Sequence, residues 1–289
     1  MTWYYLALIS ACFVALFEIT EKKILVREHS FDFLATSSLF MAAMSLPMIF
    51  YLDVALPDTK TLLFIFIKSV FAVTSIIFAA RSLRHMEVSE YSPLMNMSPI
   101  FLFFMSIFFL GETFTLFNVM GLLLIIFGAY IVELKGNLLS PLKKMYKDKY
   151  IHFLIFSFIF VSLSAIMDRF ILLQDVSIEV MFFYNRIFCA VLLFGVVSSL
   201  YNGFRDITKV AKRSFVPVLV FSALYMAADY VYYMAVKDPE AKIALIIPMK
   251  RMSTLLVTVA GGEFFKEKAI FKKSVACLVM IAGVYFIII

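Results

Sequence analysis

One pattern of residues occurs twice in the chain, and this internal repeat constrains the fold more than any single motif does. In both copies an acidic and a basic residue precede a pair of aliphatic residues and three spaced polar residues, and the copies lie about 150 residues apart. The matching positions begin at Glu21-Lys22 and Asp168-Arg169, at Gly111-Glu112 and Gly262-Glu263, and at Gly128 and Gly283. Two copies of one unit therefore fill the chain.

Composition places both copies in a membrane. Hydrophobic residues make up 63% of the chain and charged residues 16%, with a mean hydropathy of +0.98, which is more apolar surface than a water-soluble globule can bury. A helix needs about 20 apolar residues to cross the hydrocarbon core. Ten segments fit, at residues 3–20, 31–52, 61–80, 91–110, 115–134, 150–173, 179–201, 215–236, 243–260 and 270–289. Their long apolar runs exclude a barrel of short alternating strands, so we predict an all-α integral membrane protein with ten transmembrane helices.

The ten predicted helices divide into two repeats of five, at residues 1–138 and 150–289, joined by a basic connecting loop at 139–149. Because five is an odd number, the second repeat enters the membrane from the side opposite to the first. Secondary transporters use such an inverted pair for alternating access to a site near the midplane. The repeat therefore predicts a transporter, whereas the alternative is a duplication that only enlarges the lipid-packed surface.

Lysine and arginine gather in the loops after the first, third, fifth, seventh and ninth predicted helices. The positive-inside rule places these loops in the cytoplasm and both termini outside. We attribute the net charge of +6 to this topology and expect no nucleic-acid partner, because the cations are scattered over loops with no binding module beside them.

The segment Pro99–Glu112, followed by Gly121 and Gly128 on the next helix, resembles the EamA-type repeat of the drug/metabolite transporter superfamily. The segment Ile246–Gly283 resembles it too, with Lys250 at the place of the family's proline. The resemblance implies ten helices, no cofactor, a multi-pass protein of the plasma membrane, and transport of a small polar metabolite or export of an amphipathic compound, by proton coupling or exchange. Members of the superfamily usually keep their termini in the cytoplasm, which conflicts with the distribution of positive charge, so the orientation stays open.

Lys250 and Arg251 are adjacent cations near the middle of the ninth predicted helix. A charge at this depth is costly, so an ionisable residue inside the membrane is a candidate functional residue. Arginine offers a planar fork for phosphate or carboxylate, and lysine a compact charge. The pair also resembles the lysine-arginine pair with which sugar-phosphate translocators of the same superfamily hold phosphate, which implies an anion site. The alternative is a structural salt bridge to an acid on a neighbouring helix.

Asp229 in the eighth predicted helix is the best candidate for that acid. It is equally suited to bind the amine of a zwitterion or to carry a coupling proton. Lys68 and Arg186 lie about a third of the way into their helices, where they either line the site or snorkel to the membrane surface. We assign substrate binding to Lys250, Arg251, Asp229, Arg186 and Lys68, and proton coupling to Asp229 and Glu18.

Glu18 resembles the first-helix glutamate that small multidrug pumps of the superfamily use for proton coupling, and the alternative is an interfacial ion pair beside Glu21-Lys22. Because Glu21-Lys22 and Asp168-Arg169 recur symmetrically, we expect them to have a structural role at the end of a helix. Glu112 and Glu263 follow glycines at tight turns, where an acid near a helix N-terminus interacts favourably with the helix dipole.

Embedded cations outnumber the single deep acid, Asp229, and this excess predicts a secondary transporter of a small polar, anionic metabolite working by alternating access. Export of amino acids or amphipathic drugs is the alternative. An intramembrane enzyme would need a metal cluster, a carboxylate pair or an activated nucleophile, and the sequence has no such constellation, so we expect neither an enzyme nor a bound metal. A non-transporting subunit would leave the embedded charges unexplained. The expected partners are the lipid bilayer and a small-molecule substrate, with the chain a monomer or homodimer.

Overall fold

The protein is a bundle of helices in a computed structural model that describes residues 3–51, 56–86, 88–134, 150–200, 204–257 and 270–289. Within these ranges the regular structure is entirely helical, without a strand. The elements are α1 (Trp3–Leu25), α2 (Ser30–Ser45), α3 (Met48–Tyr51), α4 (Thr59–His85), α5 (Val88–Met95), α6 (Ser98–Leu110), α7 (Leu116–Glu133), α9 (Ile151–Leu172), α10 (Ile178–Leu200), α11 (Phe204–Arg213), α12 (Phe215–Lys237), α13 (Ile243–Lys250) and α15 (Ile270–Ile288).

Seven segments of the described chain are long and apolar enough to cross a membrane, and two further apolar helices are shorter. The seven are Trp3–Leu25, Ser30–Phe50, Thr59–His85, Pro93–Leu110, Ile151–Leu172, Ile178–Ser199 and Phe215–Lys237, and the shorter two are Leu116–Val132 and Val275–Ile288. The chain is therefore an all-helical, multi-pass membrane protein. The predicted connecting loop at 139–149 and the predicted acid Glu263 lie outside the described residues.

Two of the predicted segments are broken helices. Residues 91–110 form α5 and α6, which part at Asn96, and Pro99 in the first turn of α6 has no backbone N–H with which to continue α5. The segment 243–260 begins as α13, which ends at Lys250, and residues 252–257 are helical again. At that break the N–H of Arg251 bonds to the carbonyl of Pro248 at 2.9 Å, a tighter connection than in an α-helix. The two breaks fall at corresponding places in the two halves of the sequence.

Two other boundaries differ from the sequence-based prediction. Residues 31–52 do not form one helix, because α2 ends at Ser45 and a turn at Leu46-Pro47 precedes α3. The short helix α11 lies between two predicted spans where no helix was expected. It is amphipathic, since Ile207 and Val210 are buried while its basic side chains are exposed.

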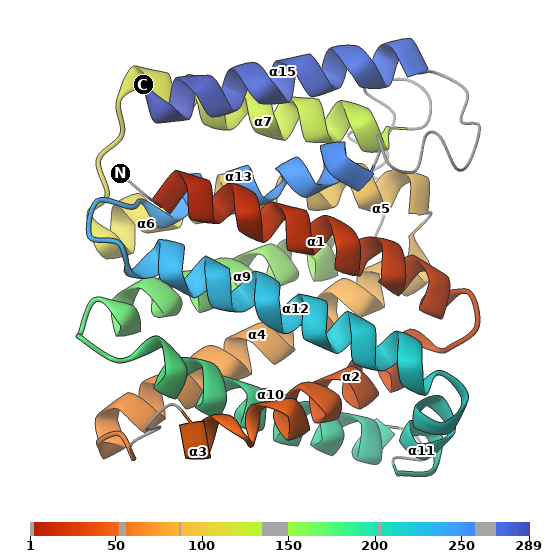
Figure 1. Ribbon diagram of the computed structural model, residues 1–289. Coiled ribbons are helices and arrows are strands. Elements are labelled where there is room, and N and C mark those ends of the chain that lie inside the picture. Colours follow the sequence, from red (N-terminus) through yellow and green to blue (C-terminus); the bar gives the residue numbers. More distant parts are fainter. Residues whose placement is uncertain (1–2, 52–55, 87, 135–149, 201–203, 258–269) are drawn as a thin grey trace.

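The main helix pairs each combine one helix from residues 1–134 with one from residues 150–289 (Figure 1). Helix α1 packs on α12, and α4 packs on α9. Helices α2 and α10 lie side by side at one edge of the bundle, and α7 and α15 lie side by side at the opposite edge. The two halves of the sequence are thus intertwined, and they share one core rather than forming separate globules.

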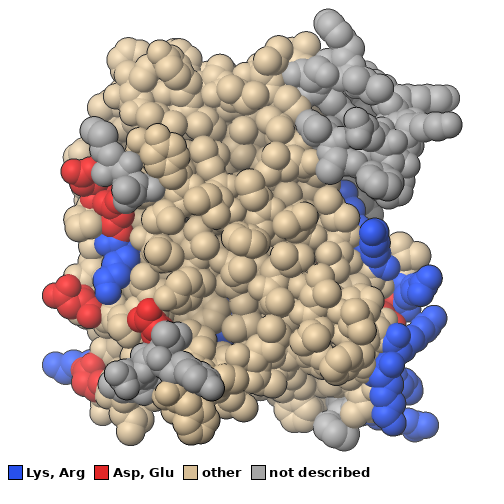
Figure 2. Space-filling view, viewed as in Figure 1, with Lys and Arg blue, Asp and Glu red and all other residues tan. Residues whose placement is uncertain are grey.

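Charged residues gather at the two ends of the bundle and leave a broad apolar band between them (Figure 2). Large hydrophobic side chains are exposed on the described helices, among them Phe104, Phe108, Val191 and Leu278. Such a surface is stable in hydrocarbon but not in water. Basic residues dominate one end of the bundle in this view, and acidic residues are found mainly at the other end, where both termini lie.

Glycines allow α7 and α15 to approach until their backbones touch. A Cβ atom added at Gly121 would lie 2.6 Å from the carbonyl oxygen of Gly283, and one added at Gly283 would lie 2.8 Å from the carbonyl oxygen of Gly121. About two turns further along α7, a Cβ atom at Gly128 would lie 2.9 Å from the carbonyl oxygen of Ala276. Small residues at such contacts are a common means of packing helices in membranes.

The substitution Gly121→Ala is expected to lower the free energy of unfolding by about 1–3 kcal/mol, because the added methyl group forces α7 and α15 apart. Thermal denaturation in detergent measures the effect. Gly195→Ala in α10 is the matched control, since a Cβ atom there has no neighbour within 4 Å. Alanine favours a helix over glycine, so the control should keep or slightly raise stability. Equal losses in both variants would contradict the close contact.

Candidate functional site

Five charged side chains from five helices lie inside the bundle, and we call this group the charged centre. It consists of Lys68 of α4, Asp168 of α9, Arg186 of α10, Asp229 of α12 and Lys250 of α13. Ion pairs divide the charged centre into two groups, one around each aspartate. A charge is tolerated in an apolar interior only where nearby partners offset its lost hydration, so these pairings explain how five charges are accommodated there.

The first group is the ion pair between Lys68 and Asp168. The Lys68 Nζ lies 3.2 Å from Asp168 Oδ1, and both side chains are only 6% exposed. The same Nζ donates a hydrogen bond of 2.8 Å to the hydroxyl of Tyr233, and the hydroxyl of Tyr232 donates one of 3.2 Å to Asp168 Oδ2. Lys68 is therefore held inside the protein, and the alternative that it snorkels to the surface is wrong.

The second group joins Arg186 and Lys250 through Asp229. The Arg186 guanidinium donates a very short hydrogen bond to Asp229 Oδ2, and the Lys250 Nζ lies 3.8 Å from Asp229 Oδ1. Arg186 is buried, with its guanidinium over the rings of Phe182 and Tyr225 at 4.9 and 5.3 Å from the centroids, so it does not snorkel either. The structure confirms Asp229 as the acid that pairs with Lys250.

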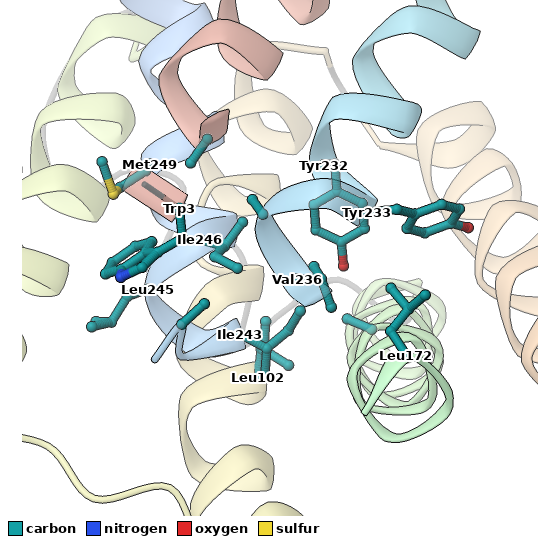
Figure 3. Close-up of a cluster of buried hydrophobic side chains, with 14 of the residues drawn as sticks. Trp3, Leu102, Leu172, Tyr232, Tyr233, Val236, Ile243, Leu245, Ile246 and Met249 are labelled. Atoms are coloured by element: carbon teal, nitrogen blue, oxygen red, sulfur yellow. The ribbon is translucent and has the colours of Figure 1, made fainter. Parts of the chain in front are cut away.

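Two adjacent tyrosines of α12 connect the two groups. Lys250 Nζ lies 4.1 Å above the ring of Tyr232, whose hydroxyl binds Asp168, and Asn185 of α10 donates a hydrogen bond of 3.2 Å to the hydroxyl of Tyr233. Figure 3 shows both tyrosines on α12 as members of the buried cluster that also includes Trp3 and Ile246. The phenol groups thus join all five charges into one network bordered by an apolar core.

The charged centre has a net positive charge and one more accessible side. Three cations face two carboxylates, which leaves one positive charge in excess. The side chains of Lys250 and Asp229 are 18% and 20% exposed, compared with 6% for Lys68, Asp168 and Arg186. A small ligand would therefore meet Lys250 and Asp229 first.

Arg251, the sequence neighbour of Lys250, contacts the start of α6. Its Nη2 donates a hydrogen bond of 3.2 Å to the hydroxyl of Ser98 at the start of α6. Arg251 lies at the break after α13 and Ser98 follows the break between α5 and α6, so this bond links the two broken helices. Asn96, at the break between α5 and α6, donates a hydrogen bond of 3.2 Å to the carbonyl of Ala129 on α7.

Glu18 lies in the second half of α1 at a half-buried position. The two residues predicted to couple protons lie on different helices, Glu18 on α1 and Asp229 on α12. Asp229 is at the centre of the charged network, whereas Glu18 lies toward the end of the first helix that carries Lys22 and Lys23.

Two charged residues fix the connection between α12 and α13. The Arg169 guanidinium donates to the carbonyls of Val236, Asp238 and Pro239, the last at 2.9 Å. Glu112 accepts hydrogen bonds from the N–H groups of Ile243 and Ala244, at 2.7 and 3.5 Å, in the first turn of α13. The predicted contact of Glu112 with a helix N-terminus is confirmed, at α13 rather than at the helix that follows Glu112 in the sequence.

Four members of the network were not singled out from the sequence as site residues: Asp168, Asn185, Tyr232 and Tyr233. Asp168 was expected to serve with Arg169 at the end of a helix, but only Arg169 caps a connection, and Asp168 points inward to Lys68. Asp168 lies a full turn before the end of α9. A charge at that distance from the helix end could have been recognised in the sequence as one that lies inside the bundle. The tyrosines and Asn185 gave no signal, because aromatic and amide residues are common in packed membrane helices.

Charged residues that pair inside a multi-pass helical bundle are an arrangement found in membrane transporters. Residues 1–134 match the model of the EamA-like transporter family. This match covers the N-terminal part of the chain and confirms the predicted resemblance there. No curated protein matches the chain significantly. A solved structure, described only as the crystal structure of a protein, has the same fold with a TM-score of 0.72, covering 98% of this chain and 94% of that chain at 13% identity.

Proposed function

We propose that the protein is a secondary transporter of a small anionic metabolite, which binds between Arg186 and Lys250. The observation that carries this proposal is the position of Asp229, whose two carboxylate oxygens each face one of these cations. A substrate carboxylate or phosphate has the charge and shape to replace Asp229 there, because guanidinium groups bind such anions with two parallel hydrogen bonds. Asp229 thus holds the empty site together and releases the cations to the substrate.

We further propose that residues 1–138 and 150–289 are inverted repeats of five spans each. The support is the pairing of the helices. In this arrangement α9, α10, α12 and α15 are the counterparts of α1, α2, α4 and α7. If each helix is replaced by its counterpart, the pair α1–α12 becomes the pair α9–α4, and both of these pairs are packed together. The other two pairs, α2–α10 and α7–α15, each join a helix to its own counterpart. Two halves related in this way support alternating access, since exchanging their conformations exchanges the side that is open.

The broken helices support a site near the middle of the membrane. Discontinuous helices at corresponding positions of two repeats mark the substrate site in many transporters, because they free backbone groups where the chain lines a passage. Here one break follows Lys250 directly, and Arg251 connects it to the other break at Ser98. Arg251 is then a residue that couples the two repeats rather than a direct ligand. Between the two predicted coupling residues, we assign proton coupling to Asp229, which lies in the charged centre.

The proposal predicts that Lys250→Gln removes anion binding. Purified wild-type protein should gain thermal stability with glucose 6-phosphate, malate or another small anion, because binding to the folded state raises stability by about 2.7 kcal/mol at 100 times Kd. The Lys250→Gln variant should lose this gain, since the anion then lacks one of its two cations. Lys242→Gln is the matched control, because Lys242 precedes the same helix and lies over the ring of Phe114 instead.

The same measurement separates the anion transporter from the alternative exporter. Amino acids and lipophilic cations are tested beside the anions. If an amino acid or a lipophilic cation stabilises both wild type and Lys250→Gln while anions stabilise neither, the substrate is not an anion and Lys250 has a structural role. Loss of anion binding in Lys242→Gln as well would show that the effect is not specific to the charged centre.

A further inference from the structure

Helix α11 carries a stripe of exposed cations that the proposed transport function does not use. Arg205, Lys209 and Lys212 are spaced by four and three residues, which places them on one face of a helix, and all three are exposed. The opposite face is anchored in the protein. Ile207 packs in a buried cluster with Phe31, Ala35 and Val197, and Val210 packs in another with Ile24, Phe33, Val218 and Phe221. The stripe is therefore presented outward by a fixed helix.

The protein's own acids neutralise only part of this charge. Lys209 pairs with Asp206 at 3.0 Å, and Arg213 lies 3.8 Å from Glu28. Within the described ranges, Arg205 and Lys212 have no such ion pair, and both are exposed. Arg205 lies near the start of α11, which follows α10, and Lys212 lies near its end, before α12. Two cations are thus available to an outside anion.

The position of α11 relative to the membrane identifies that anion. The helix lies between the candidate spans Ile178–Ser199 and Phe215–Lys237, so it lies at the level where the hydrocarbon ends. Phe215 and Val216 begin α12, one residue after α11 ends, and are exposed, which provides apolar surface for an acyl chain next to the cations. Figures 1 and 2 place α11 at the end of the bundle where basic residues gather. For this proposal we adopt the orientation of the positive-inside rule, which places that end at the cytoplasmic leaflet. Anionic phospholipids are exposed in that leaflet.

We propose that α11 is a binding site for an anionic phospholipid, with Arg205 and Lys212 on the headgroup phosphate and Phe215 and Val216 against an acyl chain. An amphipathic helix with a basic face binds anionic lipid by this combination of charge and apolar contact. Because α11 packs on α2 and α12, and α12 carries Asp229, a bound lipid stabilises helices that hold the charged centre. The site does not depend on the identity of the transported substrate.

The test compares thermal stability in a neutral detergent with added phosphatidylglycerol or phosphatidylcholine. Phosphatidylglycerol should stabilise the wild type more than phosphatidylcholine does. The double variant Arg205→Gln/Lys212→Gln should need a phosphatidylglycerol concentration at least about fivefold higher for the same rise in melting temperature, since each basic residue near an anionic surface adds appreciably to binding. The control Arg81→Gln/Arg84→Gln removes the same charge from the exposed end of α4 and should respond like wild type.

Three results would overturn the proposal. These are equal stabilisation by both lipids, an equal loss in the two double variants, and stabilisation by soluble glycerol 3-phosphate that matches the lipid. The first would mean that headgroup charge does not matter, the second that attraction is spread over the whole basic end, and the third that the ligand is a free phosphate. Because Arg205 and Lys212 are exposed, the double variant should keep the wild-type melting temperature without lipid, and Lys212→Gln alone provides a second, milder variant.

Discussion

Replacing Lys68 by methionine is expected to lower the free energy of unfolding by about 3–5 kcal/mol. The substitution keeps the length of the side chain but leaves the Asp168 carboxylate, which is 6% exposed, with the hydroxyl of Tyr232 as its remaining polar contact in the first group. It also removes the 2.8 Å hydrogen bond to Tyr233. Unfolding by sodium dodecyl sulfate in mixed micelles measures the loss.

A double substitution separates the ion pair from general damage to α4. Lys68→Met/Asp168→Leu removes both charges, and a buried ion pair replaced by apolar residues often costs little, so most of the lost stability should return. Lys60→Met makes the same change at an exposed position in the first turn of α4 and should alter stability by less than about 0.5 kcal/mol. If the double variant is as unstable as Lys68→Met, the two residues are not coupled and the assigned ion pair is wrong.

The second large effect is expected at Asp229, with opposite signs for stability and for ligand binding. Without ligand, Asp229→Asn should lower the free energy of unfolding by about 1–3 kcal/mol, because Arg186 and Lys250 lose their shared carboxylate. Anion affinity should rise by about tenfold, or about 1.4 kcal/mol, because the internal competitor is gone and the excess positive charge of the centre increases. Thermal shift over a range of anion concentrations yields both quantities.

Asp168→Asn is the matched control, since it makes the same charge change in the same network but faces Lys68. Its effect on anion affinity should be several-fold smaller than that of Asp229→Asn, because Lys68 is engaged with Tyr233 and is little exposed. A drop in anion affinity in Asp229→Asn would show that the carboxylate helps to bind the substrate, as it would for the amine of a zwitterion, and would favour the amino-acid exporter.

Hydropathy predicted the spans well because the bilayer requires about 20 apolar residues in one helix, whatever the tertiary contacts. The positions of α1, α4, α9, α10 and α12 agree with the predicted segments to within a few residues. Hydropathy does not register where a helix breaks inside an apolar run. The breaks at Asn96 and after Lys250 depend on backbone hydrogen bonds near prolines, to which an average over side chains is insensitive.

The candidate site was predictable in part for a similar reason. A charge inside a predicted span is visible in the sequence, so Lys68, Arg186, Asp229 and Lys250 were found. Which charges meet depends on how far each helix is rotated about its axis. Lys250 and Arg251 are neighbours in the sequence, yet one faces Asp229 and the other Ser98. Asp168 was missed as a site residue because the spacing of the repeat grouped it with Arg169, which points away to the connection after α12.

If the charged centre carries the proposed anion across the membrane, its single excess positive charge determines how that transport responds to the membrane potential. Moving one elementary charge through 100 mV is worth about 2.3 kcal/mol. When a monovalent anion is bound, the five charged groups and the substrate sum to zero, and a change of conformation carries no net charge from them. In the proposed alternating-access cycle, the empty centre would retain its positive charge, so its return would be the voltage-sensitive step. Exchange of one monovalent anion for another would then be electrically silent, and net flux would depend on voltage through the return of the empty carrier.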